Sequence, residues 1–202
     1  MAEEKLKVQP LDLGDQIICG VDEAGRGPLA GPVFAAAVIL PPGLEIEGLD
    51  DSKKISAKKR DVLFDLIKEQ ATAYSIALAS VEEIDQMNIL QATFLAMRRA
   101  VEGLEIKPDL ALIDGNRVAP MTIEAKSVIG GDSKYAAIAA ASVLAKVARD
   151  RHMLEIDALY PQYEFARHKG YGTKLHYEML AQFGPSPAHR RTFLKNMNRA
   201  KE

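Results

Sequence analysis

The sequence has very little cysteine: Cys19 is the only one in 202 residues. An internal disulfide is therefore excluded, and a single free thiol is typical of a reducing compartment. Cys19 lies in an apolar run, where a small core residue is a better interpretation than a nucleophile. No apolar run is long enough to cross a bilayer, and residues 1–5 lack the layout of a signal peptide. We therefore expect a cytoplasmic protein that makes no contact with membranes.

Several common motifs and a marked excess of charge are also missing. There is no Walker-type phosphate loop, no Gly-x-Gly-x-x-Gly between a strand and a helix, and no zinc spacing among the four histidines. The formal net charge is only −2, but residues 1–50 contain three Lys/Arg against nine Asp/Glu, whereas residues 161–202 contain eight against three. An acidic half for a metal and a basic end for phosphates would suit a nuclease, although a basic tail without a partner has the same composition.

Two adjacent carboxylates, Asp22 and Glu23, follow an apolar run that resembles a buried strand. Unpaired carboxylates at a buried strand end either take up a proton or need a cation. Neighbours on a regular strand point to opposite faces, so both acids can serve one site only if the strand ends or bends here, as Gly25 and Gly27 permit. Arg26 between these glycines adds a fixed positive charge, and the combination suggests phosphate-ester chemistry with a divalent metal.

Two further acids follow predicted elements of the same kind. The apolar run 110–113 leads into Asp114, which is either an Asx-type turn residue or a ligand beyond a strand end. Asp132 follows two glycines and is either a helix N-cap or a metal ligand at the same sheet edge. Lys146 lies about 21 Å further along the predicted helix, so we interpret it as a surface or packing residue.

Asp22, Glu23, Asp114 and Asp132 together provide four carboxylates and no histidine ligand. Oxygen ligands alone suit Mg²⁺ or Mn²⁺ and disfavour zinc. Four carboxylates could hold two ions, which can activate a water and stabilise the leaving oxygen of a phosphoryl displacement. A separate loop places Tyr171 between two glycines, where its ring either stacks on a sugar or base or anchors a turn.

Strands alternate with helices along the chain, which predicts an α/β domain. The first two strands are joined by a short connection without an evident helix, so they should be antiparallel and the sheet mixed. Strands are predicted at residues 16–19, 33–40, 73–79, 110–113 and 122–128, and helices after the caps Ser56 and Ser80, over 89–102, from 132 or 133 to 159, and around 175–183 and 188–197. In the helix after Ser56, Val62, Leu63, Leu66 and Ile67 should form the buried face.

These motifs resemble type 2 ribonuclease H, the bacterial ribonuclease HII family, over residues 17–193. The resemblance rests on DEAGRGPLAGP at 22–32, DSKK at 51–54, DG at 114–115, DSKY at 132–135, AASVLAKV at 140–147 and KGYGT at 169–173, which follow in the family's order. It implies a ribonuclease H-like fold with a mixed sheet flanked by helices. Residues 1–160 would form the catalytic domain, and residues 161–202 a short, basic, helical C-terminal extension packed on it.

The resemblance also implies an activity. The enzyme would cleave the RNA strand of RNA–DNA hybrids and incise 5′ of single ribonucleotides in duplex DNA, giving 3′-hydroxyl and 5′-phosphate ends, in DNA replication and repair. The metal-binding catalytic acids would be Asp22, Glu23, Asp114 and Asp132. Gly25, Arg26 and Gly27 would hold the ribonucleotide, partly through backbone contacts to its 2′-hydroxyl. Tyr171 would pack on the next sugar, and Lys53, Ser133 and Lys134 would contact phosphates.

Other expectations concern partners and alternatives. We expect a monomer. No clamp-binding peptide is evident at Arg199–Glu202, so the sequence makes no prediction of a sliding-clamp interaction. Two other functions compete: a metal-dependent nuclease or phosphoryl transferase of this fold with another substrate, and a non-catalytic nucleic-acid-binding module, which would bind equally well without metal.

Overall fold

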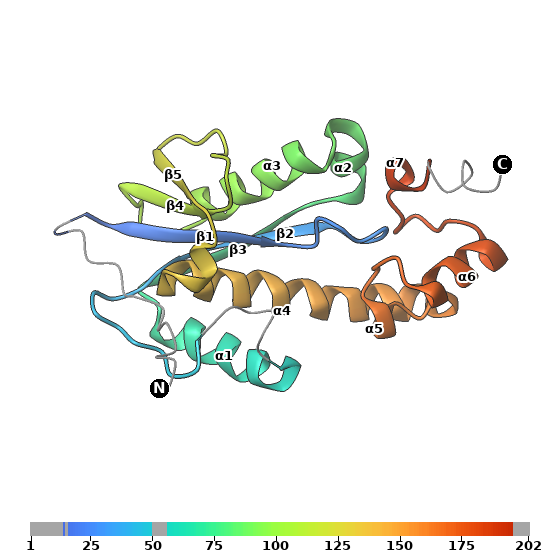
Figure 1. Cartoon of the computed structure of the whole chain (residues 1–202), viewed down its shortest axis with the longest axis horizontal. Coiled ribbons are helices and arrows are strands. Elements are labelled where there is room, and N and C mark those ends of the chain that lie inside the picture. Colours follow the sequence, from blue (N-terminus) through green and yellow to red (C-terminus); the bar gives the residue numbers. More distant parts are fainter. Residues whose placement is uncertain (1–13, 15, 50–55, 196–202) are drawn as a thin grey trace, which may run out of the picture.

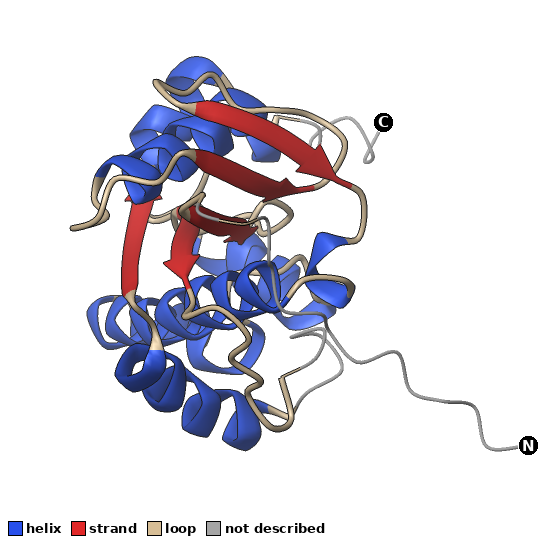
Figure 2. Cartoon of the chain, turned by 90° about the vertical axis from the view of Figure 1, so that its left-hand side faces the viewer, coloured by secondary structure: helices blue, strands red, loops and turns tan. Residues whose placement is uncertain are grey.

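The computed structural model describes residues 14, 16–49 and 56–195. Five strands form one sheet in the order β3-β2-β1-β4-β5, and helices cover both of its faces (Figures 1 and 2). The pairs β1–β2 and β2–β3 are antiparallel, whereas β1–β4 and β4–β5 are parallel, which confirms the predicted mixed sheet. The strands are β1 Ile18–Ala24, β2 Val33–Ile39, β3 Ala73–Ala79, β4 Leu110–Asp114 and β5 Glu124–Val128.

The helices begin close to where the sequence predicts them. Ser56 caps the first helix by accepting a hydrogen bond from the Lys59 amide, and Ser80 with Glu83 forms a capping box. The α-helices are α1 Ala57–Gln70, α2 Val81–Met87, α3 Ile89–Glu102, α4 Ala136–Leu159, α5 Phe165–His168, α6 Lys174–Phe183 and α7 Arg191–Leu194; the 3-10 turns are η1 Gly131–Ser133 and η2 Pro161–Tyr163. Among the described residues, no helix is long and apolar enough to span a membrane.

The two faces of the sheet have separate cores. Cys19 and Val21 of β1 point into the core beneath α3, and burial raises the pKa of the Cys19 thiol to about 12, as expected of a core residue. Ile18 points to the opposite face, where it packs with Ile138 of α4. Because side chains alternate along a strand, Gly20 and Asp22 also point towards α4. This alternation places the first acid of the predicted site under the long helix.

Helix α4 lies directly on β1 and runs in the same direction. A Cβ on Gly20 would stand 2.2 Å from the carbonyl carbon of Ala137, and a Cβ on Gly25 would stand 2.1 Å from Arg149 Nε. From Ala137 to Arg149 the helix rises about 18 Å over twelve residues, and from Gly20 to Gly25 the strand rises about 17 Å over five residues. The two elements therefore cover the same distance side by side. Residues in the middle of α4 therefore lie beside Asp22.

The C-terminal segment packs against the β1–β2 connection and the far end of α4 (Figure 1). Leu29 and Ala30 from that connection share a core with Met153 of α4 and with Phe165 and Leu180 of the segment. The division into a catalytic domain at residues 1–160 and an extension at 161–202 stays a prediction.

Three local predictions are wrong. Strand β1 does not end before the acids but continues through Asp22 and Glu23 to Ala24, because it pairs with β2 there. Asp132 is not the N-cap of the long helix: it lies in η1, and Tyr135 occupies the cap position without a side-chain hydrogen bond. Val62 is exposed on α1, and Phe64 is buried instead. The buried residues of this helix are Leu63, Phe64 and Ile67, and Val62 lies outside the face that they form.

Candidate active site

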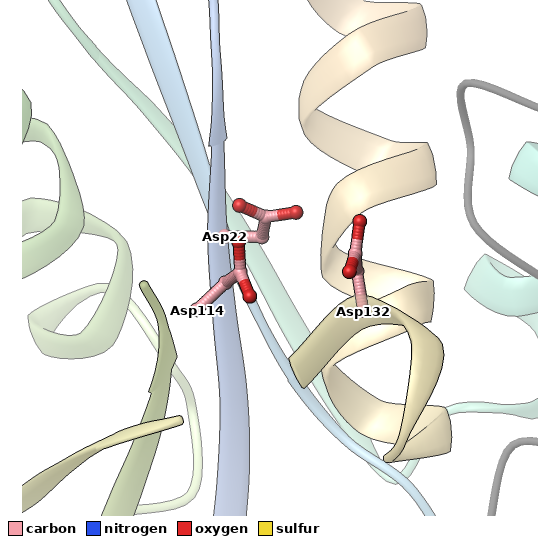
Figure 3. A group of neighbouring side chains, drawn as sticks. All are labelled: Asp22, Asp114 and Asp132. Atoms are coloured by element: carbon pink, nitrogen blue, oxygen red, sulfur yellow. The ribbon is translucent and has the colours of Figure 1, made fainter. Parts of the chain in front are cut away.

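Three carboxylates meet between the sheet and the start of α4. Asp22 comes from β1, Asp114 from the end of β4 and Asp132 from η1 (Figure 3). One oxygen from each can be chosen so that all three lie within 4.8 Å of one another. The sequence predicted that these three acids gather at one edge, and the structure brings them together.

Strand register explains the meeting of the first two acids. Val21 of β1 pairs with Ile113 of β4 in the parallel ladder, so Asp22 and Asp114 follow side by side and share the α4 face. The third acid is brought in by the main chain, because the Gly131 amide donates a 2.7 Å hydrogen bond to Asp114 Oδ1. This bond fixes the turn that carries Asp132.

The electrostatics of the cluster favour a cation. Burial raises the pKa of Asp22 well above its usual range, and the charges of Glu23 and Asp114 raise it further. The Glu23 amide, 2.7 Å from Asp22 Oδ1, and the Ser142 hydroxyl act in the opposite direction. Crowded carboxylates that offer only oxygen ligands fit a divalent cation such as Mg²⁺ or Mn²⁺, which would offset their mutual repulsion.

Glu23 lies apart from this group of three, because it follows Asp22 on the strand and points to the opposite face. Its carboxylate forms a 3.3 Å ion pair with Arg26. Glu23 nevertheless borders both cavities at this edge. One, of about 200 Å³, also contains Asp22 and Asp114, and the other, of about 350 Å³, extends under α3 towards Leu90 and Met97.

The smaller cavity, here called the acid cleft, is lined by residues from four parts of the chain: Asp22, Glu23, Ala24, Gly25, Asp114, Ser142, Lys146 and Tyr171. Tyr171 is 41% exposed, and its ring centroid lies 5.8 Å from Lys146 Nζ and 5.5 Å from Arg149 Cζ. Tyr171 therefore forms one wall of the cleft, with the cationic groups of Lys146 and Arg149 near its ring. Gly25 forms another wall.

Three residues of this site were missed or misread in the sequence. The interpretation of Lys146 as a surface or packing residue is wrong, because it lines the acid cleft, where Asp150 holds it at 2.7 Å. Ser142 lies in the motif at 140–147 but received no role, and neither did Arg149, which lies 5.5 Å from the Tyr171 ring. Ser142 lies four residues before Lys146 and Arg149 three residues after it, so all three side chains lie on one side of the helix. The sequence alone does not tell which side of the helix faces the site.

The predicted phosphate contacts are not part of the acid cleft. The Ser133 hydroxyl donates to the Gly130 carbonyl, and the exposed Lys134 ammonium donates to the Ile129 carbonyl at 2.7 Å. Both residues follow Asp132 at the end of η1, and neither lines the two cavities at this edge. Lys53 lies outside the described residues, so its predicted role stays a prediction.

The histidines, although they have no zinc spacing, are not scattered in space. His176 Nε2 lies 3.0 Å from His189 Nε2, and the His168 ring stacks on His176 at 4.3 Å between centroids. His176 Nδ1 lies 3.0 Å from the Tyr171 carbonyl. The sequence did not reveal this buried cluster, which stands directly behind the wall formed by Tyr171.

Comparisons with known proteins agree with this architecture. A family model described as Ribonuclease HII matches residues 19–197. The chain is 59% identical over 179 residues to the ribonuclease HII of Burkholderia vietnamiensis (strain G4 / LMG 22486), covering 89% of this chain and 83% of that protein.

Among solved structures, the ribonuclease H2 from Pyrococcus horikoshii OT3 matches with a TM-score of 0.71 and 29% identity, covering 87% of this chain and 92% of that one. A structure of the PCNA:RNase HII complex from Archaeoglobus fulgidus matches with a TM-score of 0.68 and 25% identity, covering 86% and 93%. These likenesses confirm the predicted ribonuclease H-like fold.

Proposed function

The chain belongs to the ribonuclease HII family and is a metal-dependent endoribonuclease of RNA–DNA hybrids, and we propose that it also incises duplex DNA 5′ of a single embedded ribonucleotide. The observation that carries this proposal is the acid cleft, where Asp22 and Asp114, two of the three carboxylates within 4.8 Å of one another, line the same cavity as Gly25 and Tyr171. A reaction centre and two elements suited to a sugar thus share one small cavity.

In this proposal Asp22, Asp114 and Asp132 are the central metal ligands, and Glu23 completes the set from the other side of the strand. Two bound Mg²⁺ or Mn²⁺ ions would supply an activated water and stabilise charge on the leaving 3′-oxygen. The protein's own part is to hold the carboxylates in place: Ser142 and the Glu23 amide orient Asp22, and the Gly131 amide orients Asp114. The products carry 3′-hydroxyl and 5′-phosphate ends.

Recognition of the ribonucleotide falls to the loop of Gly25, Arg26 and Gly27. The 2′-hydroxyl both donates and accepts hydrogen bonds and is the group that separates RNA from DNA. Backbone groups of a glycine-rich loop can approach it closely, and Gly25 borders the cleft. Tyr171, on the other wall, is placed to pack on the sugar of the next nucleotide. Ser133, Lys134 and Lys53 remain proposed phosphate contacts.

A similar archaeal enzyme has been solved in complex with PCNA. In this chain the C-terminal residues Arg199–Glu202, where the sequence shows no clamp-binding peptide, lie outside the described residues. A monomeric enzyme stays a prediction.

The proposal is tested with a labelled DNA duplex that contains one ribonucleotide. The protein is incubated with it in Mg²⁺, in Mn²⁺ or in EDTA, and the cut is mapped on a denaturing gel beside an all-DNA duplex and a continuous RNA–DNA hybrid. We expect a metal-dependent nick on the 5′ side of the ribonucleotide and no cut in the all-DNA duplex. Cleavage of the hybrid without that nick would refute the single-ribonucleotide activity, and cleavage of plain DNA would favour a different nuclease of this fold.

A further inference from the structure

A buried arginine of the C-terminal segment forms hydrogen bonds to the glycine-rich loop. Arg190 has no exposed surface, and its guanidinium donates to three carbonyls of the β1–β2 connection. The distances are 2.6 Å from Nη2 to the Gly25 carbonyl, 2.9 Å from Nη1 to the Arg26 carbonyl and 2.8 Å from Nε to the Gly31 carbonyl. One side chain thus fixes both ends of a turn more than 150 residues away in sequence, since its separation from Gly31 is 159 residues.

The other side of this loop is left open to a ligand. Within the described part of the chain, the amides of Gly25, Arg26 and Gly27 donate no hydrogen bond, while the carbonyls of Gly25 and Arg26 are both held by Arg190. Gly25 has a φ of +99°, a conformation that side chains rarely adopt. Because Arg190 holds two carbonyls of the loop, its N–H groups remain the donors available to an oxygen-rich ligand.

Further contacts fix the position of Arg190 itself. Its amide donates to the Leu29 carbonyl at 2.9 Å, and the Gly31 amide donates to the Ala188 carbonyl at 2.8 Å. Asp85 contributes a nearby negative charge, and burial, with the charge of Arg149, lowers the pKa of Arg190 to about 9, which keeps it a cation at neutral pH. Its three hydrogen bonds are therefore charge-assisted.

A lysine could not make the same contacts. The guanidinium is a planar fork of five N–H groups, and here it reaches three carbonyls that diverge around it, whereas an ammonium is a point charge on a flexible stem. The geometry therefore depends on the shape of arginine as well as on its charge.

We propose that Arg190 is a positioning residue for ribose recognition: by holding the Gly25, Arg26 and Gly31 carbonyls, it presents the loop amides to the ribonucleotide. This rests on the proposed function of the loop. Arg190 does not reach the acid cleft, so it acts through the loop and touches neither metal nor substrate.

The test compares Arg190→Lys with Arg191→Lys, an equal change at the exposed neighbouring residue. Affinities of the full chain in EDTA are measured by fluorescence anisotropy for a duplex with one ribonucleotide and for the same duplex in DNA. We expect Arg190→Lys to reduce the ratio of the two affinities about tenfold or more, the effect of losing one charge-assisted hydrogen bond. Arg191→Lys should keep the wild-type ratio. An unchanged ratio in folded Arg190→Lys, even with both affinities weakened together, would overturn the proposal.

A second measurement does not depend on the substrate. Amide hydrogen exchange over residues 25–31 should be faster in Arg190→Lys than in Arg191→Lys, because a less firmly held loop opens the hydrogen bonds from Leu29 to Gly170 and from Gly31 to Ala188 more often. Unchanged exchange in this peptide would refute the positioning role. If the wild-type protein binds both duplexes equally, the proposed ribose recognition fails, and exchange alone decides whether Arg190 holds the loop. Should Arg190→Lys fail to fold, Arg190→Gln is measured in the same way.

Discussion

The Gly131 amide donates a 2.7 Å hydrogen bond to the Asp114 carboxylate, and this single contact joins the end of β4 to the turn that carries Asp132. Two acids that are 18 residues apart in sequence are thereby held as one unit. Asp114 has two functions in this arrangement, since it is a negative charge in the candidate metal site and a hydrogen-bond acceptor for the turn. The two functions can be separated by mutation.

Asp114→Asn should remove activity and keep the fold. The asparagine carbonyl can still accept the Gly131 amide, but one negative charge of the cluster is lost. We expect cleavage of an RNA–DNA hybrid to fall at least about 100-fold, as for the loss of one electrostatic group of a reaction centre, with a melting temperature within a few degrees of wild type. Asp114→Ala should in addition lose about 1 kcal/mol of stability, because the Gly131 amide has no acceptor. Near-normal cleavage by Asp114→Asn would contradict the metal assignment.

Asp22→Asn should stabilise the protein while inactivating it. Burial and the charges of Glu23 and Asp114 raise the Asp22 pKa, so the ionised carboxylate opposes folding above its normal pKa when no metal is bound. A neutral amide of the same shape removes this cost. Thermal unfolding in EDTA should show an increase of about 1–2 kcal/mol in stability, the size of a typical gain at a strained active site. Cleavage should be lost, and added Mg²⁺ should stabilise the variant less than it stabilises wild type. A lower melting temperature in EDTA would refute this interpretation.

The sequence was informative for several elements that depend on a local pattern. The capping box at Ser80, the helix 89–102 and the strand 73–79 were predicted with the observed bounds, because each depends on neighbouring residues. The meeting of Asp22, Asp114 and Asp132 was expected because the first two follow apolar runs and the third opens the next predicted helix. Their mutual arrangement was not, because it depends on the register of β1 against β4.

Other features depend on contacts between distant segments. The extension of β1 to Ala24 follows from pairing with β2, and the cleft position of Lys146 follows from the parallel course of β1 and α4. The hydrogen bond from Arg190 to the Gly25 carbonyl joins residues 165 apart in sequence. In the sequence, Arg190 is one of several basic residues in a charged C-terminal segment. Only the fold shows that it binds the glycine-rich loop.

Gly20→Ala should be strongly destabilising. A Cβ at this position would stand 2.2–2.5 Å from backbone atoms of Ala137 and Ile138, so strand β1 and helix α4 would have to separate. We expect a loss of about 1–3 kcal/mol or more in the free energy of unfolding measured in urea, typical of overpacking a core. Gly27→Ala is the matched control, since nothing lies within 4 Å of its Cβ position and its stability should stay near wild type. Equal stability of the two variants would show that the contact of β1 with α4 is not rigid.

The buried histidines should make the protein sensitive to mild acid. Burial lowers the pKa values of His176 and His189 to about 4, below the value of 6.5 expected in an unfolded chain. Between pH 6.5 and 4 the unfolded state therefore binds protons that the folded state does not, so stability is complete above pH 6.5 and falls as the pH decreases to about 4. Urea unfolding at several pH values should show this slope.

His189→Gln should reduce the slope, because one of the two groups no longer titrates. His152→Gln, at a partly exposed histidine paired with Glu155, should leave the contribution of the buried pair in place. Identical slopes for wild type and His189→Gln between pH 6.5 and 4 would exclude the buried pair as its source.

Tyr171 should matter most where a ribonucleotide is followed by DNA. Its ring forms a wall of the acid cleft, its carbonyl is held by His176, and Lys146 and Arg149 lie near its face. Tyr171→Ala removes the stacking surface, which is worth about 1–3 kcal/mol, so kcat/KM at a single embedded ribonucleotide should fall roughly 5- to 150-fold. Tyr171→Phe keeps the ring and should retain most activity. Tyr177→Ala removes an equally exposed ring outside the cleft and is the control. On a continuous hybrid the loss in Tyr171→Ala should be smaller, because ribose lies at both positions there, and an equal loss on both substrates would argue against a role for Tyr171 at the RNA–DNA junction.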